Sequence, residues 1–431
     1  MQDFRCIITA YAMTERLYHQ NSFLYDFTSR VLGVRDVAGR KALELERTAF
    51  YPTSGGQRHD TGWLELTGAD GQPLPNTPKV RVEDVIEDEA ANIILHVVDA
   101  LPLLPGEPFA RGFVDVERRQ DHMQQHSGQH VLSAVLLTLY NAPTVSFHMG
   151  EETCTIDLDV AALSPAQLEQ AELQANRMVW EDRQVLSHQV TPEQAAKAGV
   201  RKLPEGDFAT LRLVEVRGVD LCACCGTHVN TTGQIGHIQL RKVEKVKQGL
   251  RVEFLCGARA LRTARKDYTV LTEAAALYSS HIWEVPAQTS KLLESNRAAA
   301  KHQQKLLEEI AELAAAQTIV RTPEVNGLRV ISEFLPTRDL NYAKLYAQKL
   351  VASGAEVIAL IGAGLGSPAV VFAATKASGF DAGAALKSAV SAAGGRGGGN
   401  KEMAQGGVPD AALIPALLEA VAQSVRKAVQ P

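Results

Sequence analysis

Four side chains in two short stretches of the sequence are of the types that bind transition metals. His126 and His130 are four residues apart, so in a helix both imidazoles project from one face, one turn apart. Cys224 and His228 flank a short segment centred on Gly226, which can curl both donors toward one point. Three imidazole nitrogens and one thiolate suit tetrahedral zinc. The sequence therefore predicts one Zn²⁺ per chain, bound by His126, His130, Cys224 and His228.

Each half of this site also has a simpler interpretation. Two histidines spaced as HxxxH are often just partly exposed side chains of a helix. The cysteines within residues 222–225 could end an apolar strand or form a redox pair. Because both halves occur in one chain, we interpret them together as a metal site, although spacing alone does not show that they meet.

Length and composition limit the function classes. A chain of 431 residues with 45% hydrophobic and 22% charged residues is typical of a globular protein of two to four domains. No apolar run is long enough to span a bilayer, and no secretory signal is visible, so we expect no membrane partner. Three of the six cysteines lie within residues 222–225, which makes a poor disulfide framework and favours a reducing compartment, the cytoplasm. The net charge of -5 argues against a generally basic RNA-binding surface but leaves a local basic patch open.

Residues 1–115 are expected to form a small β-barrel with a glycine-rich loop. Alternating or apolar runs, separated by Gly, Pro and Asp, predict strands at 9–11, 42–45, 80–85 and 92–98. Within residues 47–57, Gly55 and Gly56 let the backbone turn and approach a ligand closely. The hydroxyls of Thr48, Thr53 and Ser54 lie beside them. An ordinary hairpin turn is the alternative interpretation.

Residues 116–258 are expected to form an α+β zinc-binding domain. The helix that carries the two histidines comes first. A second helix should begin at Ser164 and Pro165, which suit a cap and a first turn, and run to about residue 182. Strands are expected at 146–149, 155–158, 208–216 and 238–240. For two further histidines, His122 and His148, we expect surface or packing roles.

Residues 259–325 predict a helical connector, and residues 326–431 predict an α/β domain. Pro286 should break the connector into two helices. A helical stripe of apolar residues comprises Leu292, Leu306, Ile310 and Leu313. The connector could act as a spacer, or it or the C-terminal domain could form a homodimer. In the last part, strands are expected at 328–332, 357–361 and 369–373, and helices at 341–352 and 411–429.

Two stretches could contact phosphate. The glycine-rich run 394–399 contains Arg396 and precedes Lys401, so exposed backbone amides and two cations lie together. Its spacing matches neither a P-loop nor a dinucleotide fingerprint, and a flexible loop is the alternative. The densest basic stretch, residues 241–266, is either a solvated face or a phosphate-contacting surface.

Three motifs in fixed order resemble a known family. Residues 50–57, 126–130 and 224–229 resemble the editing domain of alanyl-tRNA synthetase and its free-standing relatives, the alanyl-tRNA editing proteins. The region around residues 394–399 resembles the C-terminal (DHHA1-like) domain that this synthetase shares with DHH phosphoesterase relatives. The resemblance covers essentially the whole chain, and its length resembles the long form of the editing protein.

The resemblance implies a function and assigns roles. It implies hydrolysis of the ester that joins a wrong amino acid, serine or glycine, to alanine tRNA. Zinc would polarise the carbonyl, lower the pKa of water, or seat the aminoacyl end. Thr48 resembles a threonine that senses the serine hydroxyl, a more selective device than pocket size alone. The implied site comprises Thr48 and Gln57 as catalytic residues, Gly55, Gly56 and Thr227 as substrate-binding residues, and Arg396 and Lys401 as tRNA-binding residues.

One departure and three alternatives accompany this interpretation. The family commonly has glycine after its metal cysteine, where this chain has Cys225, so Cys225 or Cys222 could replace Cys224 as the ligand. The alternative function is a zinc-stabilised tRNA-binding protein without hydrolytic activity. We do not expect a complete synthetase, because the chain begins directly in the barrel. A metalloprotease is not expected either, because Ser127 stands where HExxH has its glutamate.

Overall fold

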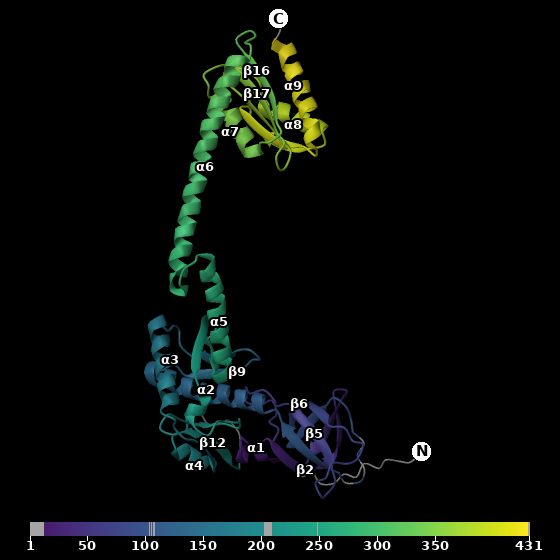
Figure 1. Ribbon diagram of the computed structural model, residues 1–431, viewed down its shortest axis with the longest axis vertical. Helices are drawn as coiled ribbons and strands as arrows, with labels where there is room; N and C mark the ends of the chain where they lie inside the picture. The colour runs from purple at the N-terminus through teal and green to yellow at the C-terminus, as the bar shows by residue number, and fades with distance from the viewer. Residues whose placement is uncertain are drawn as a thin grey trace, which may run out of the picture. The chain divides into compact units, whose positions relative to one another are not determined.

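The structure is a computed structural model that describes residues 13–102, 104, 106, 108–201, 209–247 and 249–429 (Figure 1). The chain divides into two compact units, Met1–Glu273 and Ala274–Pro431. Both units contain helices and β-sheet, so the expected mixed α+β class is confirmed. The strand expected at residues 9–11 lies outside the described residues. No helix in the described part of the chain is both long and apolar enough to cross a membrane.

Six antiparallel strands at the start of the first unit close into a barrel. Their order around the barrel is β2 (Asp26–Val37), β3 (Arg40–Leu45), β7 (Ile93–Val98), β6 (Val80–Asp88), β5 (Gly62–Thr67) and β8 (Phe109–Val114). Inward-facing residues fill the interior, among them Leu43, Leu45, Leu64 and Val82. Outside the barrel, β4 (Arg47–Thr48) pairs in parallel with β1 (Glu15–Arg16), next to the short helix α1 (Leu17–Gln20). β4 leads directly into the glycine-rich loop.

The remainder of the first unit packs two helices against two antiparallel sheets. The helices are α2 (Val116–Tyr140) and α3 (Pro165–Trp180), with a short α4 (Pro192–Lys197). One sheet has the order β14 (Ile238–Val246), β15 (Gly249–Cys256), β10 (Cys154–Leu158), β9 (Thr144–Met149). The other has the order β11 (Val185–Val190), β12 (Leu211–Val216), β13 (Asp220–Ala223). Ser164 caps α3 in a capping box with Gln167, and Pro165 lies in its first turn, as the sequence predicts.

α2 is the helix that positions two candidate ligands, and it is buried on all sides from Gln125 to Leu136. A helix buried all round must pair its polar side chains inside the protein. Gln125 donates to the carbonyl of Cys256 at 3.0 Å and accepts from its amide at 2.8 Å. The hydroxyl of Ser133 lies 2.6 Å from that of Thr144. These contacts fix the rotation of α2 against β9 and β15.

A buried ion pair joins the barrel to α2. Arg119 and Asp60 are both fully buried, and the guanidinium Nε donates to the two carboxylate oxygens at 3.1 and 3.0 Å. Arg119 also donates to the carbonyls of Ser22, at 2.7 Å, and Ala49. Asp60 accepts from the amide of Tyr51 at 2.6 Å. The glycine-rich loop is therefore tied at both ends to the helix that carries the histidines.

The second unit is a five-stranded sheet covered by helices on both faces (Figure 1). The strand order is β16 (Arg329–Leu335), β17 (Val357–Ala363), β18 (Ala369–Ala374), β20 (Met403–Gly407), β19 (Arg396–Gly399). The helices α6 (Val285–Arg321) and α7 (Leu340–Val351) pack on one face. The helices α8 (Ala382–Ala392) and α9 (Ile414–Val429) pack on the other. The strands and helices expected within residues 328–429 are all present.

The connector contains two helices, as expected, but the break lies ahead of Pro286. α5 (Gly257–Leu277) ends before a turn at residues 278–281, and a short 3₁₀ turn (Ile282–Glu284) leads into α6. Pro286 lies in the first turn of α6. Proline is tolerated there because an amide in the first turn has no partner within the helix.

The glycine-rich run near residue 396 is not a loop. Residues 396–399 form β19, an edge strand that pairs with β20. A Cβ at Gly397 would lie 2.6 Å from both Cα of Gly406 and Cδ2 of Leu386. Glycine therefore allows the strand to lie close to α8 and β20. Packing alone thus explains a glycine-rich composition that would also suit a phosphate-binding loop.

Candidate metal centre

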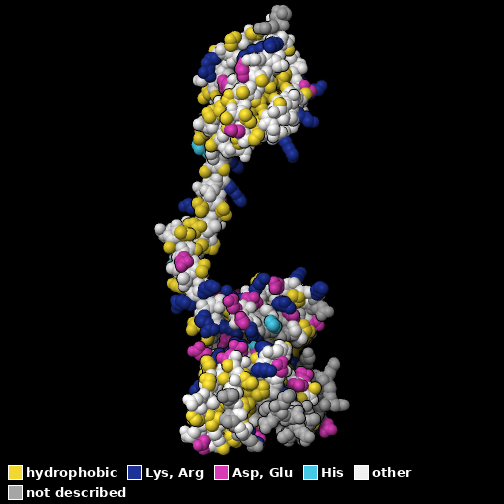
Figure 2. Space-filling view, turned by 90° about the vertical axis from the view of Figure 1, so that its right-hand side faces the viewer, with side chains coloured by type: hydrophobic (Ala, Val, Ile, Leu, Met, Phe, Trp, Pro, Cys, Tyr) yellow, Lys and Arg dark blue, Asp and Glu magenta, His cyan; other side chains and the backbone are white. Residues whose placement is uncertain are grey.

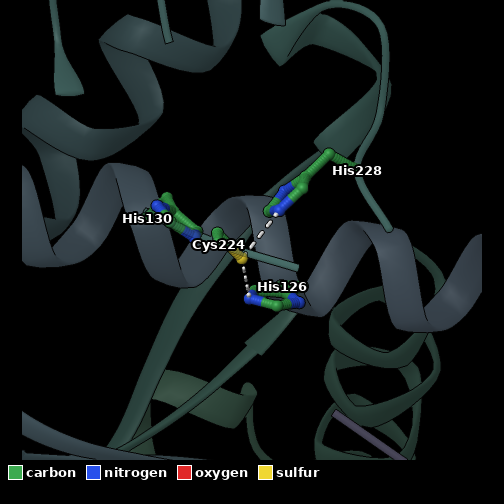
Figure 3. Close-up of side chains that lie close together, drawn as sticks. All are labelled: His126, His130, Cys224 and His228. Carbon is green, nitrogen blue, oxygen red and sulfur yellow. Dashed lines mark hydrogen bonds between the residues drawn. The ribbon is translucent and has the colours of Figure 1, made fainter. Parts of the chain in front are cut away.

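The four side chains singled out in the sequence meet in the first unit (Figure 3). His126 and His130 project from α2 one turn apart, and Cys224 and His228 come from the segment that follows β13. Their potential ligand atoms all lie within 4.8 Å of one another. Sγ of Cys224 is 3.4 Å from Nε2 of His126 and 3.3 Å from Nε2 of His228. The three histidines are buried and Cys224 is half-buried.

Gln57 of the barrel determines how His126 faces the cluster. The Nδ1–H group of His126 donates to Oε1 of Gln57 at 2.8 Å, so Nε2 is left for a metal. The same oxygen accepts from the amide of Thr227 at 3.1 Å, and Nε2 of Gln57 donates to the Thr227 hydroxyl at 2.8 Å. Both Gln57 and Thr227 are fully buried. In this structure they contact each other, and Gln57 contacts His126; their catalytic and substrate-binding roles stay predictions.

His130 is oriented by a carboxylate that sequence reasoning missed. Its Nδ1 lies 2.9 Å from Oδ2 of Asp220, and Asp220 in turn accepts from Arg201 at 2.8 and 3.0 Å. Burial lowers the pKa of His130, but hydrogen bonds to Asp220 and Cys224 outweigh it and raise the pKa to about 9. The sequence does offer a signal for this contact, because Asp220 lies just ahead of the cysteine cluster. Histidines that bind a metal generally donate their other ring N–H to a carboxylate, a carbonyl or water.

His228 has its outer partner on α2. Its Nδ1 lies 3.1 Å from the hydroxyl of Ser127, which also accepts from the amide of Val229 at 3.2 Å. When Nδ1 donates to Ser127, Nε2 carries the lone pair that faces Cys224. Burial lowers the pKa of His228 to about 3.

Among the three neighbouring thiols, the geometry selects Cys224. Cys222 groups with His130 and Asp220 instead, and Cys225 is exposed. Burial raises the pKa of Cys224, but the charges of His126 and His228 and hydrogen bonds lower it well below its ordinary value. The thiolate is the form that binds metals.

Gly226 explains the spacing of the cysteine half of the cluster. A Cβ there would lie 2.1 Å from Cε1 of His126, so only glycine fits against the ring. Its amide lies 3.3 Å from Sγ of Cys224, which makes it a donor to the sulfur.

The donor set fits zinc. Tetrahedral zinc with Zn–N of about 2.0–2.1 Å and Zn–S of about 2.3 Å separates its ligand atoms by roughly 3.3–3.6 Å. The two S–N distances of 3.4 and 3.3 Å agree with this geometry. Each imidazole also has a hydrogen-bond partner at Nδ1, the usual arrangement around a ligand histidine.

The glycine-rich loop of the barrel packs beside the cluster. Gly55 and Gly56 have φ of +57° and +82°, values that favour glycine. The carbonyl of Gly56 accepts from the amide of Met149 at 3.1 Å, and a Cβ at Gly56 would lie 2.6 Å from the carbonyl oxygen of Phe147. The ring of Phe147 is 5.4 Å from that of His126. Gly55 faces open space, so its backbone is accessible to a ligand, as its predicted role requires.

Thr48 is fully buried and makes its contacts within the barrel. Its hydroxyl lies 2.8 Å from Nε2 of His96 and accepts from the amide of Phe50 at 3.0 Å. Nδ1 of His96 donates to the carbonyl of Leu43 at 3.1 Å, so Nε2 is the acceptor and Thr48 the donor. These two hydrogen bonds use one of the two lone pairs of the Thr48 oxygen.

Arg396 and Lys401 lie in the second unit and are exposed. Arg396, on β19, lines a groove of about 670 Å³ together with Asn341 and Ser367. Lys401 lies in the turn between β19 and β20. Their expected role in tRNA binding stays a prediction.

Two domain families match parts of the chain. The Threonyl and Alanyl tRNA synthetase second additional domain matches residues 211–252, which include Cys224 and His228. The DHHA1 domain matches residues 343–427 of the second unit. The C-Ala domain of Aquifex aeolicus alanyl-tRNA synthetase aligns with 26% of this chain and 99% of that domain, at 16% identity and a TM-score of 0.23, a level from which we infer nothing.

Curated relatives match nearly the whole chain. The alanine–tRNA ligase of Methanothrix thermoacetophila is 30% identical over 97% of this chain and 45% of the ligase. That of Archaeoglobus fulgidus is 30% identical over 92% of this chain and 42% of the ligase, so the chain spans less than half the length of these ligases. The alanyl-tRNA editing protein AlaX-L of Pyrococcus horikoshii is 28% identical over 92% of this chain and 95% of that protein. The resemblance inferred from the three motifs is thus confirmed.

Proposed function

We propose that this chain, which resembles alanine–tRNA ligases and an alanyl-tRNA editing protein over nearly all its length, hydrolyses the ester that links serine, and also glycine, to alanine tRNA. The observation that carries the proposal is the cluster of three imidazoles and a thiolate beside the glycine-rich loop. Its donor set is that of a zinc site, and its neighbours fix each ring in one orientation.

Zinc is the proposed cofactor, held by His126, His130, Cys224 and His228. When bound, zinc supplies Lewis acidity, either toward the ester carbonyl or toward a water molecule. Gln57 and Asp220 orient two of the rings from outside. We expect Cys224→Ser to lose zinc and hydrolysis together, whereas Cys222→Ser and Cys225→Ser keep both. Metal analysis of the three purified variants checks this; full zinc in Cys224→Ser would remove that ligand from the proposal.

Selectivity for serine is assigned to Thr48. Its hydroxyl donates to His96 and accepts from Phe50, which leaves one acceptor position on the oxygen. In this proposal the hydroxyl of a bound serine donates to that position. Alanine has no such group, so correctly charged tRNA gains nothing from the contact.

The partner is mischarged alanine tRNA, with Arg396 and Lys401 of the second unit proposed to contact its phosphates. We place the protein in the cytoplasm. A homodimer through α6 stays a prediction, supported by the exposure of Leu292, Leu306 and Leu313, which recur at multiples of seven along that helix. Light scattering of the full chain, with Leu306→Glu as the disrupting variant, tests the dimer.

The deciding experiment measures deacylation of serine-charged alanine tRNA by the purified full chain. Alanine-charged tRNA and a chelator-treated sample are run alongside. We expect rapid loss of serine only, abolished by removing zinc and restored by adding it. If protein that carries zinc and binds the tRNA hydrolyses neither ester, the alternative function, a zinc-stabilised tRNA-binding protein, replaces this one.

A further inference from the structure

A second feature of the first unit is a cleft of about 600 Å³ beside the N-terminal half of α2. Four arginines line it: Arg58 from the glycine-rich loop, Arg118 from α2, and Arg259 and Arg262 from α5. The motif assignments leave this cleft unexplained. Arg259 and Arg262 belong to the basic stretch of residues 241–266. From the sequence alone, that stretch is either a solvated face or a phosphate-contacting surface.

Two of these arginines already have acidic partners. Arg259 is buried and forms a bidentate ion pair with Asp121, with Nε donating at 2.9 and 3.0 Å. Arg58 donates to Glu151 at 2.8 Å, but the Glu151 side chain is 75% exposed, so this pair lies in water and is weak.

The other two arginines are not neutralised in this way. In the described parts of the chain, neither Arg118 nor Arg262 forms an ion pair. Arg118 uses only Nε, which donates to the carbonyl of His59 at 2.9 Å, so its two terminal NH₂ groups are available. Arg262 is exposed. Among the described residues that line the cleft, four are arginines and three are carboxylates (Glu117, Asp121 and Glu151), so the lining carries a net charge of +1.

His122 provides an independent sign that the cleft takes a ligand. The residue is 1% exposed, lines the cleft, and its Nδ1 is buried with no hydrogen-bond partner. A buried nitrogen without a hydrogen-bond partner is costly, so it calls for an explanation, and a ligand bound in the cleft supplies one. Burial, and then the charges of Arg118 and Arg259, lower the pKa of His122 to about 2, so the ring is neutral in a positive field.

The cleft adjoins the metal cluster along two elements. On α2, His122 precedes His126 by four residues, so the two side chains leave the helix on one face, with Cβ atoms about 5–6 Å apart. In the loop, Arg58 directly follows Gln57, whose side chain accepts from His126. A ligand that enters the cleft is therefore next to the place where the proposed ester would react.

We propose that this cleft binds a backbone phosphate of the tRNA close to its charged 3′ end, an inference that rests on the function proposed above. Arg118 and Arg262 are the principal cations, Arg58 joins them by leaving its exposed partner Glu151, and His122 donates a ring N–H to a phosphate oxygen. Arginine suits this role because its planar group can donate two hydrogen bonds to one phosphate. The contact positions the acceptor end and does not take part in the reaction.

The test uses the full chain and a short acceptor-stem minihelix of alanine tRNA, which limits the RNA to the charged end. Arg262→Glu, at an exposed position, should raise the Kd for the uncharged minihelix and the KM for the serine-charged one about tenfold, with kcat within twofold. Arg118→Ala should do the same. Each variant should lower the slope of log Kd against log salt by about 1, as the loss of one phosphate contact predicts. The matched control is Arg177→Glu, an exposed arginine on α3.

The outcomes separate this inference from the proposed function. Unchanged Kd, KM and salt slope in Arg262→Glu, with active wild-type protein, would overturn the phosphate site and leave the function intact. Wild-type protein that binds the minihelix but hydrolyses nothing would refute the function, while the variants still test the cleft. A third outcome is that inorganic phosphate raises the Tm of the wild type but not of the Arg118→Ala, Arg262→Glu double variant, while both proteins bind RNA with equal affinity. The cleft would then be a site for free anions, and the inference would fail.

Discussion

At the scale of single residues, the orientation of His130 depends on Asp220. The carboxylate accepts from Nδ1 at 2.9 Å and is itself held by Arg201, so the ring presents Nε2 to the cluster. Asp220→Asn keeps the size of the side chain but removes its charge and offers an NH₂ group where an acceptor is needed. We expect zinc affinity to fall roughly 10–100-fold, since outer partners of ligand histidines commonly have this effect. Competition with a fluorescent chelator measures it.

Asp157→Asn is the control for that measurement. Asp157 also pairs with an arginine, Arg251, but on the exposed side of β10, away from the cluster. Its replacement should leave zinc affinity unchanged. Equal affinities in the two variants would show that the Asp220 contact does not matter for the metal.

His96 gives a pH dependence of stability. It is fully buried, and burial lowers its pKa from 6.5 to about 4. The unfolded chain therefore takes up a proton at this residue before the folded chain does. This contribution to the free energy of unfolding is complete above about pH 7 and is lost as the pH falls through 6.5 toward 4. At pH 4.5 the loss amounts to about 2–3 kcal/mol.

Urea unfolding at pH 7 and pH 4.5 tests this contribution. Other buried histidines also titrate, so the comparison is with His96→Gln, which cannot take up the proton. The wild type should lose about 2–3 kcal/mol more than the variant between the two pH values. Equal losses would mean that His96 is not held neutral in the folded protein.

At the scale of elements, the approach of the glycine-rich loop to β9 depends on Gly56. Gly55 and Gly56 both have positive φ, so an alanine at either costs about 1 kcal/mol in backbone strain. At Gly56 alone, the added Cβ would lie 2.6 Å from the carbonyl oxygen of Phe147. Gly56→Ala should therefore lower the free energy of unfolding by about 1–2 kcal/mol more than Gly55→Ala.

Activity should separate the same two variants. A shift of the loop moves Gln57, the next residue, and with it the hydrogen bond to His126. We expect Gly56→Ala to lower kcat for serine-charged tRNA more than tenfold at saturating zinc, and the Gly55→Ala variant to be affected less. If Gly55→Ala is the more damaged of the two, the role of Gly55 at the substrate, and not the packing of Gly56, dominates.

The elements that the sequence predicts well are those set by local patterns. The HxxxH helix, the Ser164 cap and the alternation of strand and helix after residue 326 depend on neighbours within a turn or two. Long-range partners are different. Asp220 lies 90 residues from His130, and Gln57 lies 69 from His126, so only the fold brings them together. The glycines of β19 were expected in a loop and form a strand instead, because close strand packing favours the same residue as a loop does.

At the scale of the whole molecule, the charge of the chain offers no uniform attraction for RNA. The net charge is -5, and Figure 2 shows Lys and Arg side chains interspersed with Asp and Glu on the displayed face of the first unit. Binding must therefore come from local cation groups. Two such groups are proposed here, the arginine cleft in the first unit and Arg396 with Lys401 in the second.

If both groups contact one tRNA, their covalent connection should matter more than either alone. Linking two binding modules can raise affinity by about 10²–10⁴ without any new contact, because the second module binds at a high effective concentration. The turn at residues 278–281, between α5 and the 3₁₀ turn before α6, is the place to divide the chain. A fragment of residues 1–280 keeps the metal cluster and the cleft.

We expect that fragment to deacylate a serine-charged minihelix with kcat and KM within about twofold of the full chain, because all of the proposed contacts to the charged end lie within it. For whole serine-charged tRNA, its KM should rise at least tenfold, and residues 281–431 added as a separate chain should not restore it, since the linkage is what is missing. Arg396→Ala with Lys401→Ala in the full chain should reproduce part of the rise. An unchanged KM for whole tRNA would show that the second unit does not hold the substrate.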